Sequence, residues 1–176
     1  MTTAVVLTGA PGSGKSSVLD ALSTLLEIDG TAFGALESEQ LARGFPWPAT
    51  SEWLPQLAAV IALQRQAGRD LFLVAATTET PVELHDLIGA IGADRVIVVC
   101  LRAPPDVVAQ RLTIREPDVW PGKGPLIEHA RGLALAIPAI RQIDAVLDTD
   151  GRQAAEVAAA VRELLALRGV FDQVQA

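Results

Sequence analysis

Hydrophobic residues along the chain gather in two kinds of segment, and the first kind indicates β-strands. These segments are short, almost continuously apolar and rich in β-branched residues, which is typical of strands covered on both faces of a parallel sheet. Gly34 interrupts the second of them, which is therefore the least regular. Five such segments occur, at residues 4–8, 31–36, 71–76, 95–101 and 145–149.

The second kind of segment is longer and mixes apolar and polar positions at helical spacing. Thr80-Pro81-Val82-Glu83 reads as a capping box with proline at the first helical position. Asp150 stands where it can cap the last helix. The predicted helices cover residues 15–26, 51–67, 81–91, 105–114, 126–141 and 152–167.

Strands and helices alternate along the chain, which indicates βαβ units. We therefore expect a three-layer α/β fold, with a parallel five-stranded sheet and helices on both faces. At 176 residues the chain suits a single domain spanning residues 1–176, and it contains no internal repeat or low-complexity linker.

Composition narrows the possible partners and the location. Apolar residues make up 50% of the chain and charged residues 20%, as in globular proteins. The net charge of -7 gives no general attraction to nucleic acid or to an anionic membrane, so neither partner is expected. Cys100 is the only cysteine, which excludes an intrachain disulfide and a zinc site built on cysteines. The sequence lacks a secretion signal and a run long enough to span a membrane, so we expect a cytoplasmic protein. Its oligomeric state is left open.

A glycine-rich motif stands between the first predicted strand and the first predicted helix. Residues 9–16 read GAPGSGKS and match G-x-x-x-x-G-K-[ST], the Walker A motif or P-loop. Gly12 and Gly14 can adopt positive φ, which lets backbone N–H groups point at a polyphosphate, and the following helix adds its positive dipole end. A turn without a ligand is the alternative, and the complete motif and its flanks argue against it. The predicted nucleotide-binding residues here are Gly9, Ala10, Pro11, Gly12, Ser13, Gly14, Lys15, Ser16 and Ser17.

The motif predicts ATP and Mg²⁺ as cofactors. Lys15, as a surface-facing charge, would reach the β- and γ-phosphates, and the Ser16 hydroxyl would ligate Mg²⁺. Two other P-loop classes fit less well. The N-K-x-D motif of signalling GTPases is absent, and the third predicted strand, in LFLVAATTET, is not followed by the aspartate that motor and transporter ATPases carry.

Arginines and a turn-rich segment follow the fourth predicted strand. Arg111 and Arg115 lie four residues apart, on one face of a helix. Residues 115–125 hold three prolines and two glycines, a composition that resists regular structure and predicts a mobile lid. Alternatively, the two arginines are solvated and pair with Glu116 or Asp118.

The P-loop and this arginine-bearing segment together resemble the nucleoside monophosphate kinase-like group of P-loop small-molecule kinases. This group includes shikimate, gluconate and adenylate kinases and chloramphenicol phosphotransferase. The resemblance covers the whole chain in the order of its elements, while the P-loop is the part that is specific at residue level. It implies the strand order 2-3-1-4-5 and a lid that closes over ATP and brings Arg111 and Arg115 to the transferred phosphoryl group. The implied activity is transfer of the γ-phosphoryl group to a hydroxyl of a small molecule.

An acidic residue near the end of the second predicted strand is the candidate base. Phe33-Gly34-Ala35-Leu36-Glu37 resembles chloramphenicol phosphotransferase, in which Phe-Gly is followed two residues later by an acidic residue that serves as the base. Here glutamate stands where that family would have aspartate. Glu37 would accept a proton from the acceptor hydroxyl or hold a water on Mg²⁺. Glu39 points elsewhere if this segment turns helical. Glu79, after the third strand, either replaces the missing aspartate near Mg²⁺ or is a solvated residue beside a helix cap.

The acceptor and the base of ATP have weaker candidates. Arg43, Phe45 and Trp47 follow the acidic stretch and are predicted to contact the acceptor, Arg43 through an anionic group. The alternative is that the neighbouring Trp53 packs in the core from the helix at 51–67 and that Pro46-Trp47-Pro48 only makes a turn. Arg152, after the last strand, is a candidate for stacking on adenine. Two other functions stay open, a P-loop kinase that acts on polynucleotide ends or on proteins, and a non-catalytic nucleotide-binding regulator.

Overall fold

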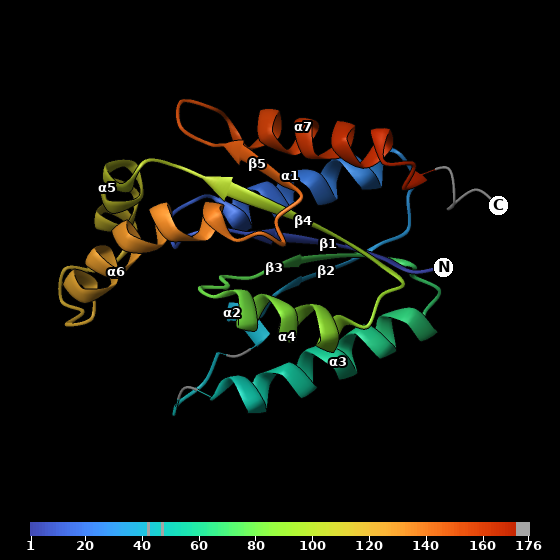
Figure 1. Cartoon of the computed structure of the whole chain (residues 1–176), viewed down its shortest axis with the longest axis horizontal. Helices are drawn as coiled ribbons and strands as arrows, with labels where there is room; N and C mark the ends of the chain where they lie inside the picture. Colours follow the sequence, from blue (N-terminus) through green and yellow to red (C-terminus); the bar gives the residue numbers. More distant parts are fainter. Residues whose placement is uncertain (42, 47, 172–176) are drawn as a thin grey trace.

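The computed structural model describes residues 1–41, 43–46 and 48–171 and contains one five-stranded sheet (Figure 1). All neighbouring strands are parallel, in the order β2-β3-β1-β4-β5, so the predicted fold class and strand order are confirmed. The strands are β1 (Thr3–Thr8), β2 (Gly34–Glu37), β3 (Leu71–Ala75), β4 (Arg95–Arg102) and β5 (Ala145–Asp148).

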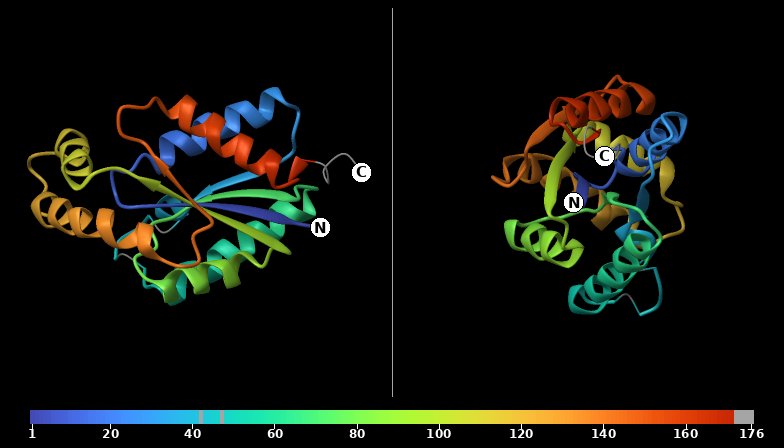
Figure 2. Two further views of the ribbon diagram at one scale, coloured as in Figure 1. Left: turned by 45° about the horizontal axis from the view of Figure 1, so that its top comes forward. Right: turned by 90° about the vertical axis from the view of Figure 1, so that its right-hand side faces the viewer.

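Helices cover both faces of the sheet, as Figures 1 and 2 show. None of the described helices is long and apolar enough to cross a membrane. The helices are α1 (Lys15–Ile28), α2 (Ser38–Leu41), α3 (Thr50–Gln66), α4 (Pro81–Ile91), α5 (Pro105–Arg115), α6 (Lys123–Ala136) with the 3₁₀ turn η1 (Ile137–Ala139), and α7 (Ala154–Leu167).

The central strand β1 contributes alternate side chains to two separate cores. Val5 and Leu7 pack with apolar residues of α1 and α7 on one face. Ala4 and Val6 pack with residues of α3, α4, α5 and α6 on the other. Because both faces are covered, β1 is buried along its whole length, which explains its unbroken apolar sequence.

The edge strand β2 lies later in the sequence than predicted. It begins at Gly34 and pairs with β3 from Phe72 to Ala75, so Glu37 is its last residue and not the first residue after it. A Cβ atom at Gly34 would lie 3.3 Å from the Gln64 side-chain oxygen. The glycine that interrupts the apolar pattern therefore allows α3 to pack closely against the start of this strand.

The first residue of α4 is the one predicted from the sequence, whereas the first residues of α6 and α7 differ from the prediction. Thr80 caps α4, because its Oγ1 accepts a hydrogen bond from the Glu83 backbone N–H at 3.2 Å. Helix α6 begins three residues earlier than predicted, at Lys123. The predicted Asp150 cap is wrong: the chain makes a further turn through Gly151, at φ 66°, and Gln153 becomes the N-cap of α7.

Candidate active site

The P-loop follows β1 at the carboxyl end of the sheet, the end from which α5 and α6 project in Figure 1. Gly12 and Gly14 have φ of 81° and 98°, as the motif predicts. Gly9 has φ of 144°, and a Cβ atom there would lie only 2.3 Å from the Leu101 carbonyl oxygen. The loop therefore needs glycine at this position to pass beside β4.

Lys15 is buried, so the prediction of a surface-facing charge is wrong. Its side chain turns back over the loop, where Nζ donates hydrogen bonds to the carbonyl oxygens of Gly9 at 3.0 Å and Ala10 at 3.2 Å. Burial lowers the pKa of this lysine to about 8, although the carboxylates of Glu39 and Glu37 act in the opposite direction. The loop thus holds a desolvated ammonium group close to two carboxylates.

A cavity of about 270 Å³ opens beside the loop and collects most of the predicted site. Gly9, Ala10 and Ser13, which were also predicted to bind nucleotide, are buried and do not line it. The lining residues are Pro11, Gly12, Gly14, Lys15, Ser16, Ser17, Glu37, Glu39, Ala75, Arg111 and Arg115.

Two carboxylates, Glu37 and Glu39, face this cavity together. Glu39 was expected to point elsewhere, and that expectation is wrong. Helix α2 begins directly at Ser38, whose side chain is buried, and this sharp turn leaves the residues on either side at the cavity. The carboxylate of Glu39 also accepts a hydrogen bond from Thr77 Oγ1 at 3.4 Å. Both residues are therefore placed to act on a molecule bound beside the loop.

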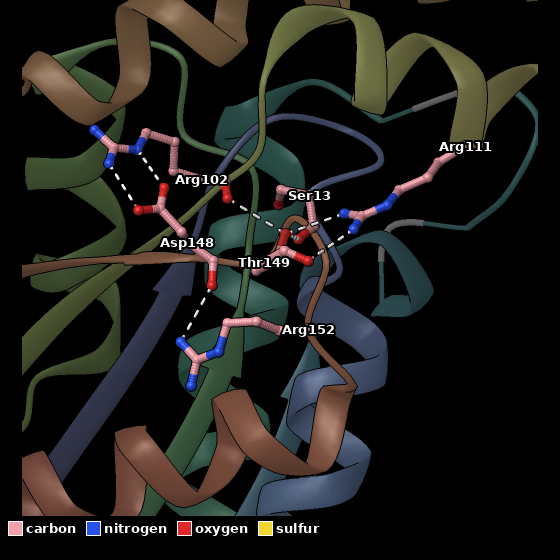
Figure 3. Close-up of polar contacts among 6 residues, drawn as sticks. All are labelled: Ser13, Arg102, Arg111, Asp148, Thr149 and Arg152. Atoms are coloured by element: carbon pink, nitrogen blue, oxygen red, sulfur yellow. Dashed lines mark hydrogen bonds and ion pairs between the residues drawn. The ribbon is translucent and has the colours of Figure 1, made fainter.

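The two arginines of α5 reach the same cavity in different ways. Arg115 pairs with Glu116 at 2.6 Å, which is one of the alternatives its sequence allowed. Arg111 donates instead to both the Oγ1 and the carbonyl oxygen of Thr149, at 3.0 and 2.8 Å (Figure 3). It also donates to the Gly12 carbonyl oxygen at 3.2 Å. The guanidinium of Arg111 is therefore fixed at the rim of the P-loop.

A second cavity of about 300 Å³ adjoins the first, since both include Gly14, Ser17 and Arg111. Arg152 lies here, with its guanidinium donating to the carbonyl oxygens of Asp148 and Glu156. Aliphatic side chains and guanidinium planes offer flat surfaces on which a nucleobase can stack. The remaining lining residues are Val18, Thr149, Gln153, Ala154 and Val157.

Thr149 is a polar residue of this site that the sequence motifs missed. It belongs to no recognised motif. Its position directly after β5, at the carboxyl edge of a parallel sheet, is the signal that could have found it, because ligands bind at that edge.

Several predicted acceptor contacts do not reach the cavity. Arg43 and Phe45 lie on an exposed stretch after α2 and are not among the lining residues. Trp47, the third of this group, lies outside the described residues. Trp53 packs against the core from α3, as the alternative explanation had it.

Glu79 is also placed away from the P-loop. Its carboxylate pairs with Nε2 of His129 at 2.8 Å and lines a different cavity, between the start of α4 and η1. The sequence allowed Glu79 a place near Mg²⁺, but the fold turns it toward α6. It is therefore a weaker candidate base than Glu37 or Glu39.

The described residues contain no cluster of three or more aspartate, glutamate, histidine or cysteine side chains that could hold a metal ion. The lining residues do fit a magnesium ion carried by a nucleotide. Ser16 stands at the start of α1 beside the backbone cradle formed at Gly12 and Gly14, with Glu37 on the same cavity. Hydroxyl, carboxylate and phosphate oxygens are the ligands that Mg²⁺ prefers.

The predicted lid is an irregular turn at residues 116–122 between α5 and α6. Lys123, expected within a flexible turn, opens α6 instead. Its Nζ donates to the carbonyl oxygens of Thr113 and Glu116, at 2.7 and 2.8 Å, and to the Asp118 carboxylate at 2.7 Å. One lysine thus joins both sides of the turn, and the mobility of this segment remains a prediction.

We expect residues 115–125 to exchange amide hydrogens rapidly in the free protein and slowly when ATP and an acceptor are both bound. The segment has little regular hydrogen bonding of its own, so closure over ligands would supply its protection. Hydrogen-exchange mass spectrometry would measure this, with strand β1, which is buried along its whole length, as an internal reference. Equally slow exchange in both states would contradict a lid.

No protein-family model matches the chain, and no curated protein matches it. Among solved structures, the APS kinase of Mycobacterium tuberculosis in complex with AMPPNP and APS has a TM-score of 0.68 at 26% identity, covering 94% of this chain and 98% of that one. A gluconokinase from Sinorhizobium meliloti 1021 has a TM-score of 0.62 at 23% identity, with 98% and 97% covered. The shikimate kinase of Acinetobacter baumannii in complex with shikimate has a TM-score of 0.60 at 18% identity, with 96% and 95% covered.

These alignments run over nearly the full length of each chain. The chain therefore has the fold of P-loop small-molecule kinases, and the resemblance predicted from the P-loop and the order of elements is confirmed.

Proposed function

We propose that this protein is an ATP-dependent kinase that transfers the γ-phosphoryl group to a hydroxyl of a small molecule. One observation carries the proposal: a single cavity joins a complete P-loop and its buried Lys15 to two carboxylates from the β2–α2 turn and two arginines from α5. A phosphate-binding loop alone would explain nucleotide binding. The carboxylates facing it add a group that can accept a proton.

The cationic groups suit the triphosphate end of the nucleotide. Phosphoryl transfer spreads negative charge over the equatorial oxygens of the transferred group, and positioned cations stabilise that charge. Lys15, Arg111 and Arg115 supply three such groups from two elements. Mg²⁺, when bound, would neutralise phosphate charge in the same region, and the Ser16 hydroxyl would help to hold it. Holding a water on Mg²⁺ is the alternative role for Glu37.

The carboxylates suit the acceptor end. Glu37, at the tip of β2, would take the proton from the acceptor hydroxyl as its oxygen attacks the γ-phosphorus and the bond to the bridging β–γ oxygen breaks, which releases ADP. Glu39 would help to orient the acceptor. The second cavity would take the nucleobase, with Arg111 and Arg152 against its faces. Two of the similar structures contain small molecules, APS and shikimate, and the one with APS also contains AMPPNP. This supports separate sites for the nucleotide and the acceptor.

The proposal is tested by acceptor-dependent release of ADP from Mg·ATP. The panel should hold small hydroxylated metabolites and hydroxylated antibiotics, with a DNA end and a protein substrate as further acceptors. We expect ADP release to increase with at least one small molecule and with neither macromolecule. Stimulation by the DNA end or the protein alone would contradict a small-molecule kinase. Nucleotide binding without turnover across the panel would favour a regulator.

Binding of Mg·ATP should also take up protons near pH 8. The pKa of Lys15 in the free protein is about 8, so about half of the lysines are neutral at that pH. A triphosphate beside Nζ favours the charged form and raises this pKa, so binding draws a proton from solution and weakens as pH rises through 8. Calorimetry in buffers of different ionisation enthalpy would measure an uptake of up to about half a proton. The uptake should be absent at pH 6, where the lysine is already charged, and equal uptake at both pH values would contradict this role for Lys15.

A further inference from the structure

Thr149 joins three separate segments of the chain around the candidate nucleotide site (Figure 3). Its backbone N–H donates to the carbonyl oxygen of Arg102, at the end of β4, at 2.8 Å. Its Oγ1 lies 2.9 Å from the carbonyl oxygen of Ser13 in the P-loop and accepts a hydrogen bond from Arg111 Nη1 at 3.0 Å. The residue is only 4% exposed, so water competes little for these bonds.

The first consequence concerns Arg111. A long arginine side chain has many rotamers, and holding its charge in one place costs conformational entropy. Three acceptors hold this guanidinium: the Gly12 carbonyl, the Thr149 carbonyl and the Thr149 hydroxyl. Two of the three belong to Thr149, which therefore largely determines where the charge of Arg111 stands. That place is the border between the two cavities.

The second consequence concerns the P-loop backbone. A hydroxyl group has one proton to donate and can also accept. The Oγ1 of Thr149 accepts from Arg111 and lies within donating distance of two carbonyl oxygens, of which Ser13 at 2.9 Å is nearer than Arg102 at 3.3 Å. Because a peptide unit is planar and trans, fixing the carbonyl of Ser13 toward Thr149 turns the N–H of Gly14 to the opposite side. Gly14 lines both cavities. The same hydroxyl thus orients a backbone donor of the loop.

Neighbouring contacts hold Thr149 itself in place. The carboxylate of Asp148 accepts two hydrogen bonds from Arg102, at 2.6 and 2.9 Å, which fasten the end of β5 to the end of β4. On the other side, Arg152 donates to the Asp148 carbonyl oxygen. Strand pairing and this two-pronged ion pair therefore fix the backbone from which the hydroxyl projects.

We propose that Thr149 is a positioning residue for nucleotide binding, acting through Arg111 and through the Ser13–Gly14 peptide. The inference rests on the proposed function in taking a nucleoside triphosphate as the ligand. A purely structural residue would stabilise the loop after β5 and leave the affinity of the folded protein for nucleotide unchanged.

The test replaces Thr149 by valine, which keeps the branched shape and removes the hydroxyl. We expect the Kd for Mg·ATP to rise about tenfold, which corresponds to the loss of one charge-assisted hydrogen bond. Thr149→Ser should restore most of the affinity, because it restores the hydroxyl. Thr113→Val is the matched control: its hydroxyl donates to the Ala109 carbonyl within α5, away from the loop, and its loss should leave the Kd unchanged. Should the valine variant fail to fold, Thr149→Ala removes the same hydroxyl without branched bulk.

A double-mutant cycle with Arg111→Ala separates positioning from stability. In the Arg111→Ala background, Thr149→Val should raise the Kd by much less than it does alone, because the partner through which it acts is gone. Additive effects in the cycle would overturn the proposal, as would a valine variant with a lowered Tm and the Kd of the unmodified protein. Absence of Mg·ATP binding by the unmodified protein would be a different result, which overturns the proposed function itself.

Discussion

Lys15→Ala is expected to abolish acceptor-dependent ATP turnover and to weaken Mg·ATP binding by at least about a hundredfold, the scale on which a buried electrostatic contact acts. The fold has already placed this ammonium in a desolvated position against the loop carbonyls of Gly9 and Ala10. A nucleotide binding there meets a charge that needs little reorganisation. Titration calorimetry and ADP release would measure the two losses.

The chain offers a matched control, because Lys123 is its only other lysine. Lys123→Ala removes an equal charge and three hydrogen bonds of the lid turn, but Lys123 does not line the cavity, so this change should weaken Mg·ATP binding far less than Lys15→Ala does. Lys15→Ala should still fold, because removing a charged form that burial disfavours offsets the loss of the hydrogen bonds to Gly9 and Ala10. Unchanged Mg·ATP affinity in Lys15→Ala would show that the P-loop assignment of this lysine is wrong.

The parts of the fold that the sequence predicted are those determined by local pattern. Buried parallel strands have unbroken apolar runs, so β1, β3 and β4 were found close to their true bounds. The edge strand β5 was found within one residue of its bounds, whereas the other edge strand, β2, was displaced because its register depends on pairing with β3 and on packing of Gly34 against Gln64. Those are contacts between distant segments, which spacing along the chain does not contain.

The features of the candidate site also fall into those determined by local sequence and those determined by contacts between distant segments. The conformation of Gly12 and Gly14 follows from the motif itself, because it is a property of neighbouring residues. Sequence spacing placed Arg111 and Arg115 on one helix face. It did not show which of the two would contact the loop after β5. That assignment depends on Thr149, which is 38 positions further along the chain than Arg111. The burial of Lys15 was also missed, because it depends on the backbone path of the P-loop, which directs the carbonyls of Gly9 and Ala10 toward Nζ.

The acceptor side was the least predictable region. Glu39 was expected to point away from Glu37 because side chains two positions apart on a helix face different directions. The chain instead turns from β2 into α2 at Ser38, and both carboxylates face the cavity. Arg43 and Phe45 were chosen for their chemistry and lie on an exposed stretch instead. A site built from a strand end and a short helix depends on one backbone turn, which residue types alone do not specify.

Glu37→Gln is expected to lower turnover by about two to four orders of magnitude, the usual contribution of a general base, while Mg·ATP affinity changes little. Glutamine keeps the size and shape of the side chain but cannot take the proton of an acceptor hydroxyl at neutral pH. Glu39→Gln is the control on the same cavity, and its effect should be mild. If Glu37 instead helps to hold Mg²⁺, Glu37→Gln should raise the Mg²⁺ concentration needed for activity, and excess metal should partly restore the rate. A fully active Glu37→Gln enzyme beside an inactive Glu39→Gln enzyme would assign the base to Glu39, whose contact with Thr77 already holds its carboxylate at the cavity.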